Sequence, residues 1–294
     1  MRKRGRRSFL RGASLALASA LRASGNREFA NSSTRLPAKP PETAPRFKLG
    51  LVTYQLGQSW DIDTIIKNCE ATRFEGSRVR LVSLGSTCEY ESPEPSVVKR
   101  NIEETRGFCE LAHDLGCMGV KVRPNGFPPG SDHAKVLEQI GQALHQCGDI
   151  ARDHGVEIWL EVHGEETERP PNIHRIMEVC NHPSVGICWN SNDNDIVDGS
   201  VKPSFELLQS WLRSCHINEL WRTPSPWVAS DDDQRAKTTS AGSPQWKKLY
   251  PWGELFALFR SAGYDRYTFA EIPASCEPLR LMRYYRALWD YQAA

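Results

Sequence analysis

Residues 157–190, EIWLEVHGEETERPPNIHRIMEVCNHPSVGICWN, contain the unit on which the prediction of the fold depends. A run of β-type residues over 157–163 is followed by a helical pattern over 173–180 and by a second β-type run over 185–190. Two strands joined by a helix in this order form the crossover unit of a parallel sheet. A polar residue stands near the end of each run, Glu161 in the first and Asn190 in the second.

The same alternation of strands and helices extends in both directions along the chain. Strands are expected over 48–54, 78–86, 119–124, 157–163, 185–190, 214–218 and 267–272. Helices are expected from Asp61, from Pro95 or Ser96, and over 134–153, 173–180, 205–212, 251–262 and 278–291. This order predicts an α/β fold of the (β/α)8 TIM-barrel type.

One strand of the expected eight is missing from this pattern. Between Gly76 and Leu81 there are too few residues for a strand, a helix and a return, because parallel strands are joined by roughly a dozen residues or more. The barrel is therefore predicted to be gapped or truncated around its second strand-helix unit. Either two strands are merged into one, or a strand-helix unit is absent.

Composition and charge limit the classes of function. The 294 residues are 39% hydrophobic, and their formal net charge is +1, with 37 basic and 36 acidic residues. Much of the positive excess lies in the first eleven residues, so the remainder is slightly acidic and argues against a nucleic-acid groove. Residues 46–294 are expected to form one barrel domain that takes a small molecule as its partner, and homo-oligomer formation stays open.

Residues 1–45 have the pattern of an export leader followed by a flexible linker. The pair Arg6-Arg7, followed by Phe9 and Leu10, resembles the twin-arginine signal, and the apolar run over 13–21 is too short for stable insertion in a membrane. A periplasmic or extracellular location is expected. The alternative interpretation is a basic, unstructured tail.

The cysteines do not indicate a disulfide framework. Their number, nine, is odd, and no pair has the spacing of a zinc ribbon or a redox motif. We expect them to be buried as small hydrophobic residues.

Metal-competent side chains stand at the ends of four successive predicted strands: Glu161, Asn190, His216 and Glu271. The carboxyl ends of barrel strands form one rim, where catalytic residues collect. Two carboxylates, an imidazole and an amide oxygen are suitable ligands for one divalent ion such as Mn²⁺ or Mg²⁺. The four residues are therefore a candidate metal site.

The chain resembles the xylose isomerase-like TIM-barrel family of sugar phosphate isomerases and epimerases, whose superfamily includes the apurinic endonucleases. The resemblance extends from Leu49 to Trp289 and is carried by the stretches LGLVTYQLGQSWD, LGSTCEYESP, NIEETRGFCELAHDLG, GVKVRPNG, EVHG, VGICWNSN, YPWGELF and LMRYYRALW. In ketose 3-epimerases of this family a Glu, an Asp, a His and a second Glu hold one divalent ion. Glu161, His216 and Glu271 match that pattern, whereas Asn190 stands where the family has Asp.

The resemblance also implies an activity. Glu161 and Glu271 would transfer the proton of a small sugar or sugar derivative through an enediolate, in an isomerase or epimerase. Arg222, six residues after His216, is at the spacing of a substrate contact in such epimerases. His163 and Lys121 also lie at strand ends and are candidate substrate contacts, although a hydrogen-bonded rim histidine and a surface lysine are equally good interpretations.

Other functions fit the same residues. A lyase or dehydratase could use the same scaffold, and the strand gap and Asn190 are compatible with a carbohydrate-binding protein of weak or lost activity. A DNA-repair phosphodiesterase is disfavoured, because it would need a multi-zinc cluster and a basic groove, and the chain has only eight histidines.

The leader can be tested directly. Replacing Arg6 and Arg7 with lysine is expected to leave the protein in the cytoplasm, because the twin-arginine route reads the arginine pair. Fractionation of cells that produce the unchanged and the substituted protein measures this. Equal export of both proteins would contradict the twin-arginine interpretation.

Overall fold

A computed structural model describes residues 45–74, 79–218, 220 and 250–294. These residues belong to one compact unit, Thr43–Ala294. Its strands are β1 (Lys48–Leu51), β2 (Ser83–Gly85), β3 (Gly119–Val122), β4 (Glu157–Glu161), β5 (Val185–Trp189), β6 (Leu212–Ile217) and β7 (Tyr267–Ala270). Its α-helices are α1 (Ile62–Thr72), α2 (Pro95–Asp114), α3 (His133–Asp153), α4 (Pro170–Cys180), α5 (Lys202–Leu208), α7 (Trp252–Ser261) and α8 (Pro278–Ala293). Short 3₁₀ turns cover Asp193–Asp195 and Gln209–Trp211.

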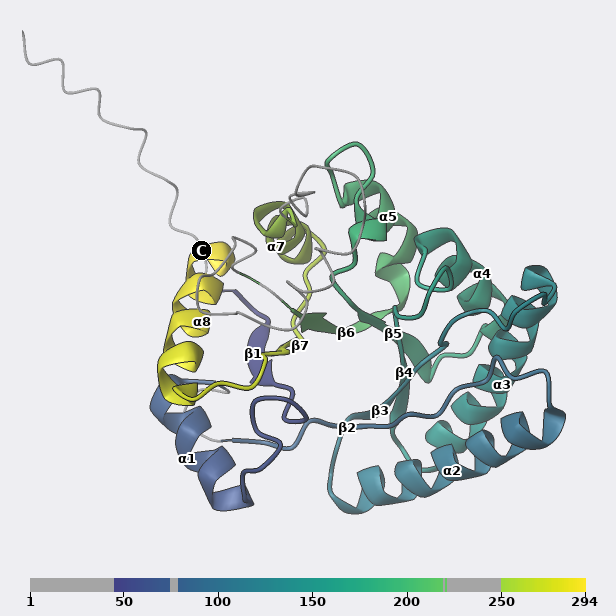
Figure 1. Cartoon of the computed structure of the whole chain (residues 1–294), viewed down its shortest axis with the longest axis horizontal. Coiled ribbons are helices and arrows are strands. Elements are labelled where there is room, and N and C mark those ends of the chain that lie inside the picture. The colour runs from purple at the N-terminus through teal and green to yellow at the C-terminus, as the bar shows by residue number, and fades with distance from the viewer. Residues whose placement is uncertain (1–44, 75–78, 219, 221–249) are drawn as a thin grey trace, which may run out of the picture. The chain divides into compact units, whose positions relative to one another are not determined.

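The seven strands form one parallel sheet in the order β1-β7-β6-β5-β4-β3-β2. Figure 1 shows them curled into a ring that is surrounded by the helices, with β1 and β2 at the two ends of the sheet. Among the residues that the structure describes, no ladder joins β1 to β2. The predicted gap is thereby confirmed, and it lies where the second strand-helix unit of a complete barrel would stand.

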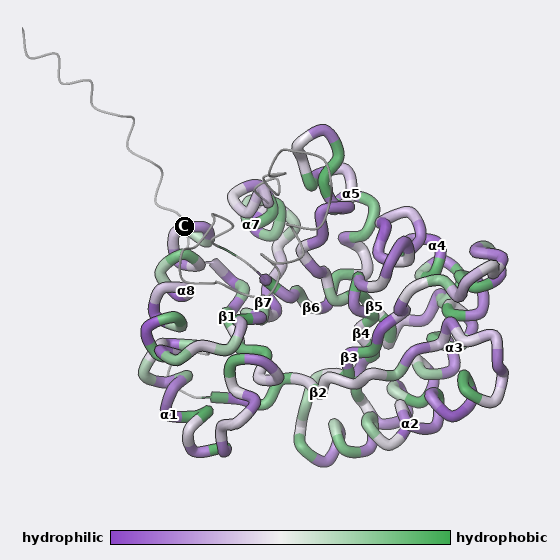
Figure 2. Tube along the Cα trace, in the orientation of Figure 1, coloured by the Kyte–Doolittle hydropathy of each residue, from purple (hydrophilic) through white to green (hydrophobic). Residues whose placement is uncertain are grey.

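Strand alternation separates two hydrophobic cores. Outward-facing residues such as Val120, Ile158 and Ile187 pack with the helices in the larger core. A smaller core, consisting of Val82, Trp159, Cys188, Tyr267 and Phe269, fills the interior of the ring. Figure 2 shows the hydrophobic residues concentrated on the strands, while the surrounding helices mix hydrophobic and hydrophilic positions. The interior core forms a floor beneath the carboxyl ends of the strands.

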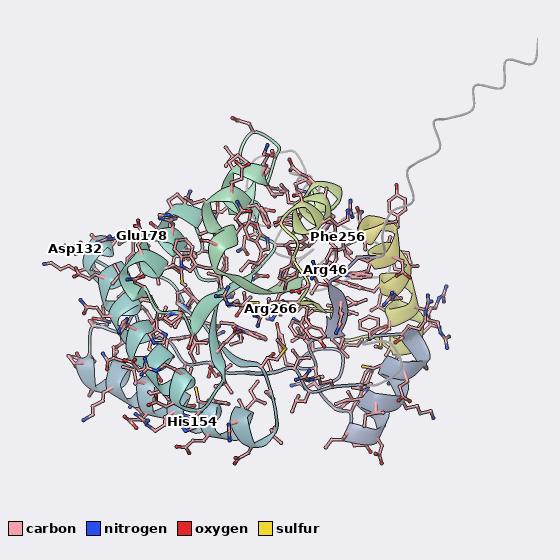
Figure 3. The ribbon with its side chains drawn as sticks, turned by 180° about the vertical axis from the view of Figure 1, so that it is seen from behind. Arg46, Asp132, His154, Glu178, Phe256 and Arg266 are labelled. Carbon is pink, nitrogen blue, oxygen red and sulfur yellow. The ribbon has the colours of Figure 1, made fainter. Side chains whose placement is uncertain are left out.

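The amino-terminal end of the ring is closed by charged residues. Arg266 donates to the Glu157 carboxylate from Nη1 at 3.2 Å, and its guanidinium lies 5.5 Å from the centroid of the Trp159 ring. Figure 3, seen from behind, shows Arg266 near the centre of the strands. These contacts lie at the end of the ring opposite the carboxyl ends of the strands.

Helix starts follow local signals in the sequence. The Asp61 side chain accepts a hydrogen bond from Thr64 N at 2.8 Å and caps α1, and Asp132 caps α3. Proline occupies the first turn of α2, α4, α5 and α8, where its missing N–H costs nothing. Helix α8 is also tied to the sheet, because the Tyr285 hydroxyl donates to Ile217 O at 2.5 Å.

Several predicted boundaries differ from the observed ones, and three elements show the largest differences. The helix expected over 205–212 begins earlier, at Lys202 before a proline, and Leu212 already belongs to β6. The strand expected over 78–86 pairs only over Ser83–Gly85, and that expected over 48–54 only as far as Leu51, because each has a partner on one side alone. The cysteine prediction is confirmed for eight of the nine, which are buried, whereas Cys276 is exposed.

The gap leaves one side of each terminal strand without a ladder partner. Val52 N donates to Ala270 O, and Ser86 N donates to Lys121 O, both at 2.9 Å. The backbone N–H groups of the even-numbered residues at the ends of β1 and β2 are therefore directed toward the neighbouring strand of the sheet. Successive residues of a strand direct their backbone groups to opposite sides. The amide hydrogens of Leu51 and Gly85 are consequently directed into the gap.

Amide hydrogen exchange measures this arrangement. The amides of Leu51 and Gly85 are expected to exchange at least about tenfold faster than those of their neighbours Gly50 and Leu84, because the latter face β7 and β3. Equal protection of all four amides would show that a further strand fills the gap.

Candidate metal centre and substrate cavity

The predicted site residues lie on the inward-facing positions of neighbouring strands. Glu161 is the last residue of β4, His216 lies near the end of β6, and Asn190 and Glu271 directly follow β5 and β7. The interior floor residues Trp159 and Phe269 stand two positions before the two glutamates, on the same side of each strand. The carboxyl rim is therefore the place where these side chains meet.

Three of the four candidate ligands form a tight group. Glu161, His216 and Glu271 each offer one ligand atom, and these atoms lie within 4.8 Å of one another. Glu161 Oε1 lies 3.0 Å from His216 Nδ1, and Glu271 Oε2 lies 3.9 Å from the same nitrogen. Glu161 and His216 are buried, and Glu271 is partly buried.

Positive groups keep Glu161 ionised. Lys121 Nζ, from β3, donates to Glu161 Oε2 at 2.8 Å. Burial alone would raise the pKa of Glu161, but the hydrogen bonds and charges of His216 and Lys121 outweigh it and hold the pKa below its ordinary value. Lys121, predicted as a substrate contact, is thus paired with a candidate metal ligand.

His216 is held in its protonated form by the same cluster. Burial would lower the pKa of the imidazole, but Cys188 and the Glu161 carboxylate raise it well above its ordinary value. An imidazole coordinates a metal only after losing its proton. Metal binding at this group of residues would therefore release a proton from His216.

The amide of Asn190 is already engaged. It is buried, and its Oδ1 accepts from Asn218 Nδ2 at 2.8 Å and from Ser191 N at 3.1 Å. Asn190 lines the same cavity as the three other candidate ligands, although its oxygen is shared with Asn218. Asn218 was not predicted as a site residue. Its position two residues after His216, at the end of a strand, could have identified it.

Tyr54 is a second residue that the sequence analysis did not identify. Its hydroxyl donates to Glu271 Oε1 at 2.5 Å and accepts from Gln55 Nε2. Burial and the hydrogen bond to Glu271 raise the pKa of Tyr54 to about 12, so the phenol is neutral at pH 7. Because Tyr54 follows β1, the strand-end rule that identified the glutamates also applied to it.

The remaining predicted contacts have different positions. His163 lines the cavity, and its buried Nδ1 has no hydrogen-bond partner among the described residues. Arg222 lies outside the described residues. Glu89, which was not among the predicted site residues, is ion-paired with Arg123 and accepts from Asn125 Nδ2 at 3.0 Å.

The donor set is suitable for a divalent ion. Two carboxylates and one imidazole from three separate strands converge in a buried, polar position, and Asn190 lies beside them. Hard oxygen donors with one imidazole accept Mn²⁺, Mg²⁺ or Zn²⁺. These ligand atoms border a cavity of about 1330 Å³, which is large enough for a sugar beside the ion.

Comparisons with known proteins agree with the fold. The family model of the xylose isomerase-like TIM barrel matches residues 53–288. No curated protein sequence matches the chain at a significant level. In the described part of the chain, no helix combines the length and the apolar character that crossing a membrane requires.

Several solved structures share the architecture. D-psicose 3-epimerase from Clostridium cellulolyticum H10, with D-tagatose, superposes with a TM-score of 0.62 and 14% identity, covering 84% of this chain and 98% of that chain. The zinc-containing IolI protein superposes with a TM-score of 0.61 and 14% identity, covering 84% and 96%. The 3-keto-D-glucoside 4-epimerase from E. coli superposes with a TM-score of 0.58 and 12% identity, covering 83% of this chain and 99% of that chain. At these identities the likeness shows the fold alone.

Metal titration of purified variants tests the ligand set. His216→Ala is expected to lose most of its bound Mn²⁺, because a ligand is removed outright. Asn190→Asp is expected to bind Mn²⁺ about tenfold more tightly or better, since an added carboxylate strengthens attraction for the ion. Isothermal calorimetry measures both changes.

Asn218→Asp is the matched control for the added charge, because Asn218 adjoins Asn190 but does not belong to the predicted ligand set. Equal tightening by both Asp variants would indicate a general charge effect. Unchanged binding in Asn190→Asp would place Asn190 outside the ligand shell.

Proposed function

Because the chain belongs to the xylose isomerase-like TIM-barrel family, we propose that it is a divalent-metal-dependent isomerase or epimerase acting on a small sugar or sugar derivative. The observation that carries this proposal is the convergence of Glu161, His216 and Glu271 in one cavity. Sugar epimerases among the solved structures of the same fold support it.

The cluster provides the groups that such a reaction needs. A divalent ion held by Glu161, His216 and Glu271 would supply Lewis acidity beside a substrate carbonyl and make the neighbouring C–H bond easier to deprotonate. Glu161 stays ionised next to Lys121, and Glu271 is oriented by the Tyr54 hydroxyl. Each carboxylate can accept a proton from carbon or return it.

The placement of the two carboxylates favours epimerisation. Glu161 ends β4 and Glu271 follows β7, and β5 and β6 separate these two strands in the sheet. Because their ligand atoms lie within 4.8 Å of each other, a sugar would lie over the cluster, and one carboxylate would reach it from the β4 side and the other from the β7 side. Removal of a proton on one side and its return on the other inverts the carbon, whereas transfer on a single side gives isomerisation.

A carbohydrate-binding protein of weak or lost activity is the second candidate. The engagement of the Asn190 oxygen by Asn218 favours it, because the metal then has one oxygen ligand fewer. A lyase or dehydratase would begin with the same proton removal. For location, we propose export to the periplasm or beyond, which the Arg6-Arg7 leader supports.

Solvent-hydrogen exchange tests the activity. Protein loaded with Mn²⁺ is incubated in D₂O with a panel of ketoses and aldoses, and mass spectrometry and NMR follow deuterium at the carbon beside the carbonyl. Glu161→Gln and Glu271→Gln are each expected to lower the exchange rate about 10²–10⁴-fold, because glutamine does not accept the proton at neutral pH.

Glu168→Gln is the control, because Glu168 lines the cavity but accepts a hydrogen bond from Asn194 instead of joining the cluster. Its exchange rate is expected to stay close to that of the unchanged protein. Sugar binding without exchange would support the binding protein, loss of water from the sugar would indicate a lyase, and neither binding nor exchange across the panel would contradict the proposal.

A further inference from the structure

The gap between β1 and β2 joins two spaces that a complete barrel keeps apart. In a closed barrel the strands separate the interior, where ligands bind, from the layer between strands and helices. Here a single cavity is lined both by Glu161 and Glu271 in the interior and by Ile62, Ile65 and Ile66 of α1 outside the sheet. The cavity therefore passes sideways through the position of the missing strand.

Figure 1 shows the elements that flank this passage. Helices α1 and α2 lie on either side of the interval between β1 and β2, and α1 packs against α8 on its other flank. Leu51 and Val52, from the β1 side, and Val79 and Leu81, from the approach to β2, line the passage. We call this passage the lateral channel; it is lined by residues 51–52, by Ile62, Ile65 and Ile66, and by residues 79–82.

The lateral channel is less polar than the interior site to which it connects. Lys121, Asn190 and the three candidate metal ligands border the interior end. Isoleucine, leucine and valine predominate at the α1 end. A ligand that filled the whole cavity would therefore have a polar head and an apolar tail.

Two exposed residues support this interpretation. Ile62 is 74% exposed and Leu81 is 50% exposed, and both line the lateral channel. Large apolar side chains grouped at an opening commonly mark a ligand or partner site. The cavity volume of about 1330 Å³ also exceeds the roughly 300–1,000 Å³ of pockets that enclose a drug-sized ligand, so a free monosaccharide would leave most of it unfilled.

We infer that the substrate is a keto sugar that carries an apolar substituent away from its carbonyl, such as an alkyl or aryl glycoside of a keto sugar. Its polyol part lies at the Glu161, His216 and Glu271 cluster, and its substituent extends through the lateral channel onto Ile62 and Leu81. The inference rests on the proposed function for the position of the sugar. The substituent is the favoured occupant of the lateral channel because the channel is continuous with the interior site, whereas a second copy of the chain would cover only its outer mouth.

Binding of a homologous series of ligands tests the inference. The probes are methyl, butyl, hexyl and octyl β-D-glucopyranoside, each below its critical micelle concentration, with the Mn²⁺-loaded full chain. Affinity measured by calorimetry is expected to increase about two- to fourfold for each methylene that enters the lateral channel. Equal affinity for the methyl and octyl compounds, or no binding of the octyl compound, would overturn the inference.

Surface variants locate the apolar contact. Ile62→Ser and Leu81→Ser are expected to remove most of the dependence on chain length while leaving the affinity for the methyl compound unchanged. Both residues are exposed, so these substitutions remove little buried core. Leu115→Ser is the matched control, because Leu115 is 49% exposed and does not line the cavity. An equal loss in the control would show nonspecific adsorption of the alkyl chains and overturn the inference.

Two measurements separate this inference from the proposed function and from self-association. Deuterium exchange into the free ketoses and aldoses, together with an alkyl glucoside affinity that does not depend on chain length, would leave the proposed function standing and refute the lateral channel. An affinity that increases with chain length, without exchange into any sugar of the panel, would support the lateral channel and contradict the proposed activity. Analytical ultracentrifugation shows whether a dimer forms through the same surface. A dimer that Leu81→Ser dissociates would assign the surface to a second copy and overturn the inference.

Discussion

Every second side chain of a parallel strand points into the barrel, and the candidate site depends on this constraint. The residues Lys121, Glu161, Asn190, His216 and Glu271 occupy inward positions at or near the carboxyl ends of five neighbouring strands. Shifting any one strand by a single residue would exchange its polar group for an apolar residue of the outer core. The order of the sheet, rather than any local motif, therefore brings the cluster together.

Hydrogen bonds from residues outside the sheet help to hold these strand ends in place. Tyr285 of α8 donates to Ile217 O at the end of β6, next to His216, and the buried hydroxyl of Tyr250 donates to Asp195 at 2.8 Å near the end of β5. Buried hydrogen bonds of this kind are costly to leave unsatisfied, so they restrict how far a strand end moves. The described residues form seven strands, and the five that carry the cluster are held on both sides by ladder partners. The missing unit falls on the part of the ring that contributes no candidate metal ligand.

The sequence predicted the strands and the main cluster because each depends on a periodic or positional signal. Glu161, His216 and Glu271 are recognisable as polar residues that end apolar strands, and the same reasoning applied to Tyr54 would have added it. The engagement of Asn190 by Asn218 was not predictable in this way, since it depends on the separation of two neighbouring strand ends. The lateral channel could not be predicted from the sequence either. The sequence indicated a missing strand-helix unit, but it did not indicate that apolar residues of α1 line the resulting gap.

The charges of the cluster explain how a site with Asn190 can still serve proton transfer. With a divalent ion present, Glu161 and Glu271 would balance its charge, and the Lys121 ammonium, 2.8 Å from Glu161, would add one positive charge. An aspartate at position 190 would cancel that excess and strengthen metal binding. Without it, an ion would be held less firmly, but a substrate oxygen that gained negative charge as its neighbouring carbon lost a proton would meet more positive surroundings. In a buried site such a charge is screened little by water, so under the proposed function the loss of one carboxylate would weaken metal binding and strengthen stabilisation of the developing oxyanion at the same time.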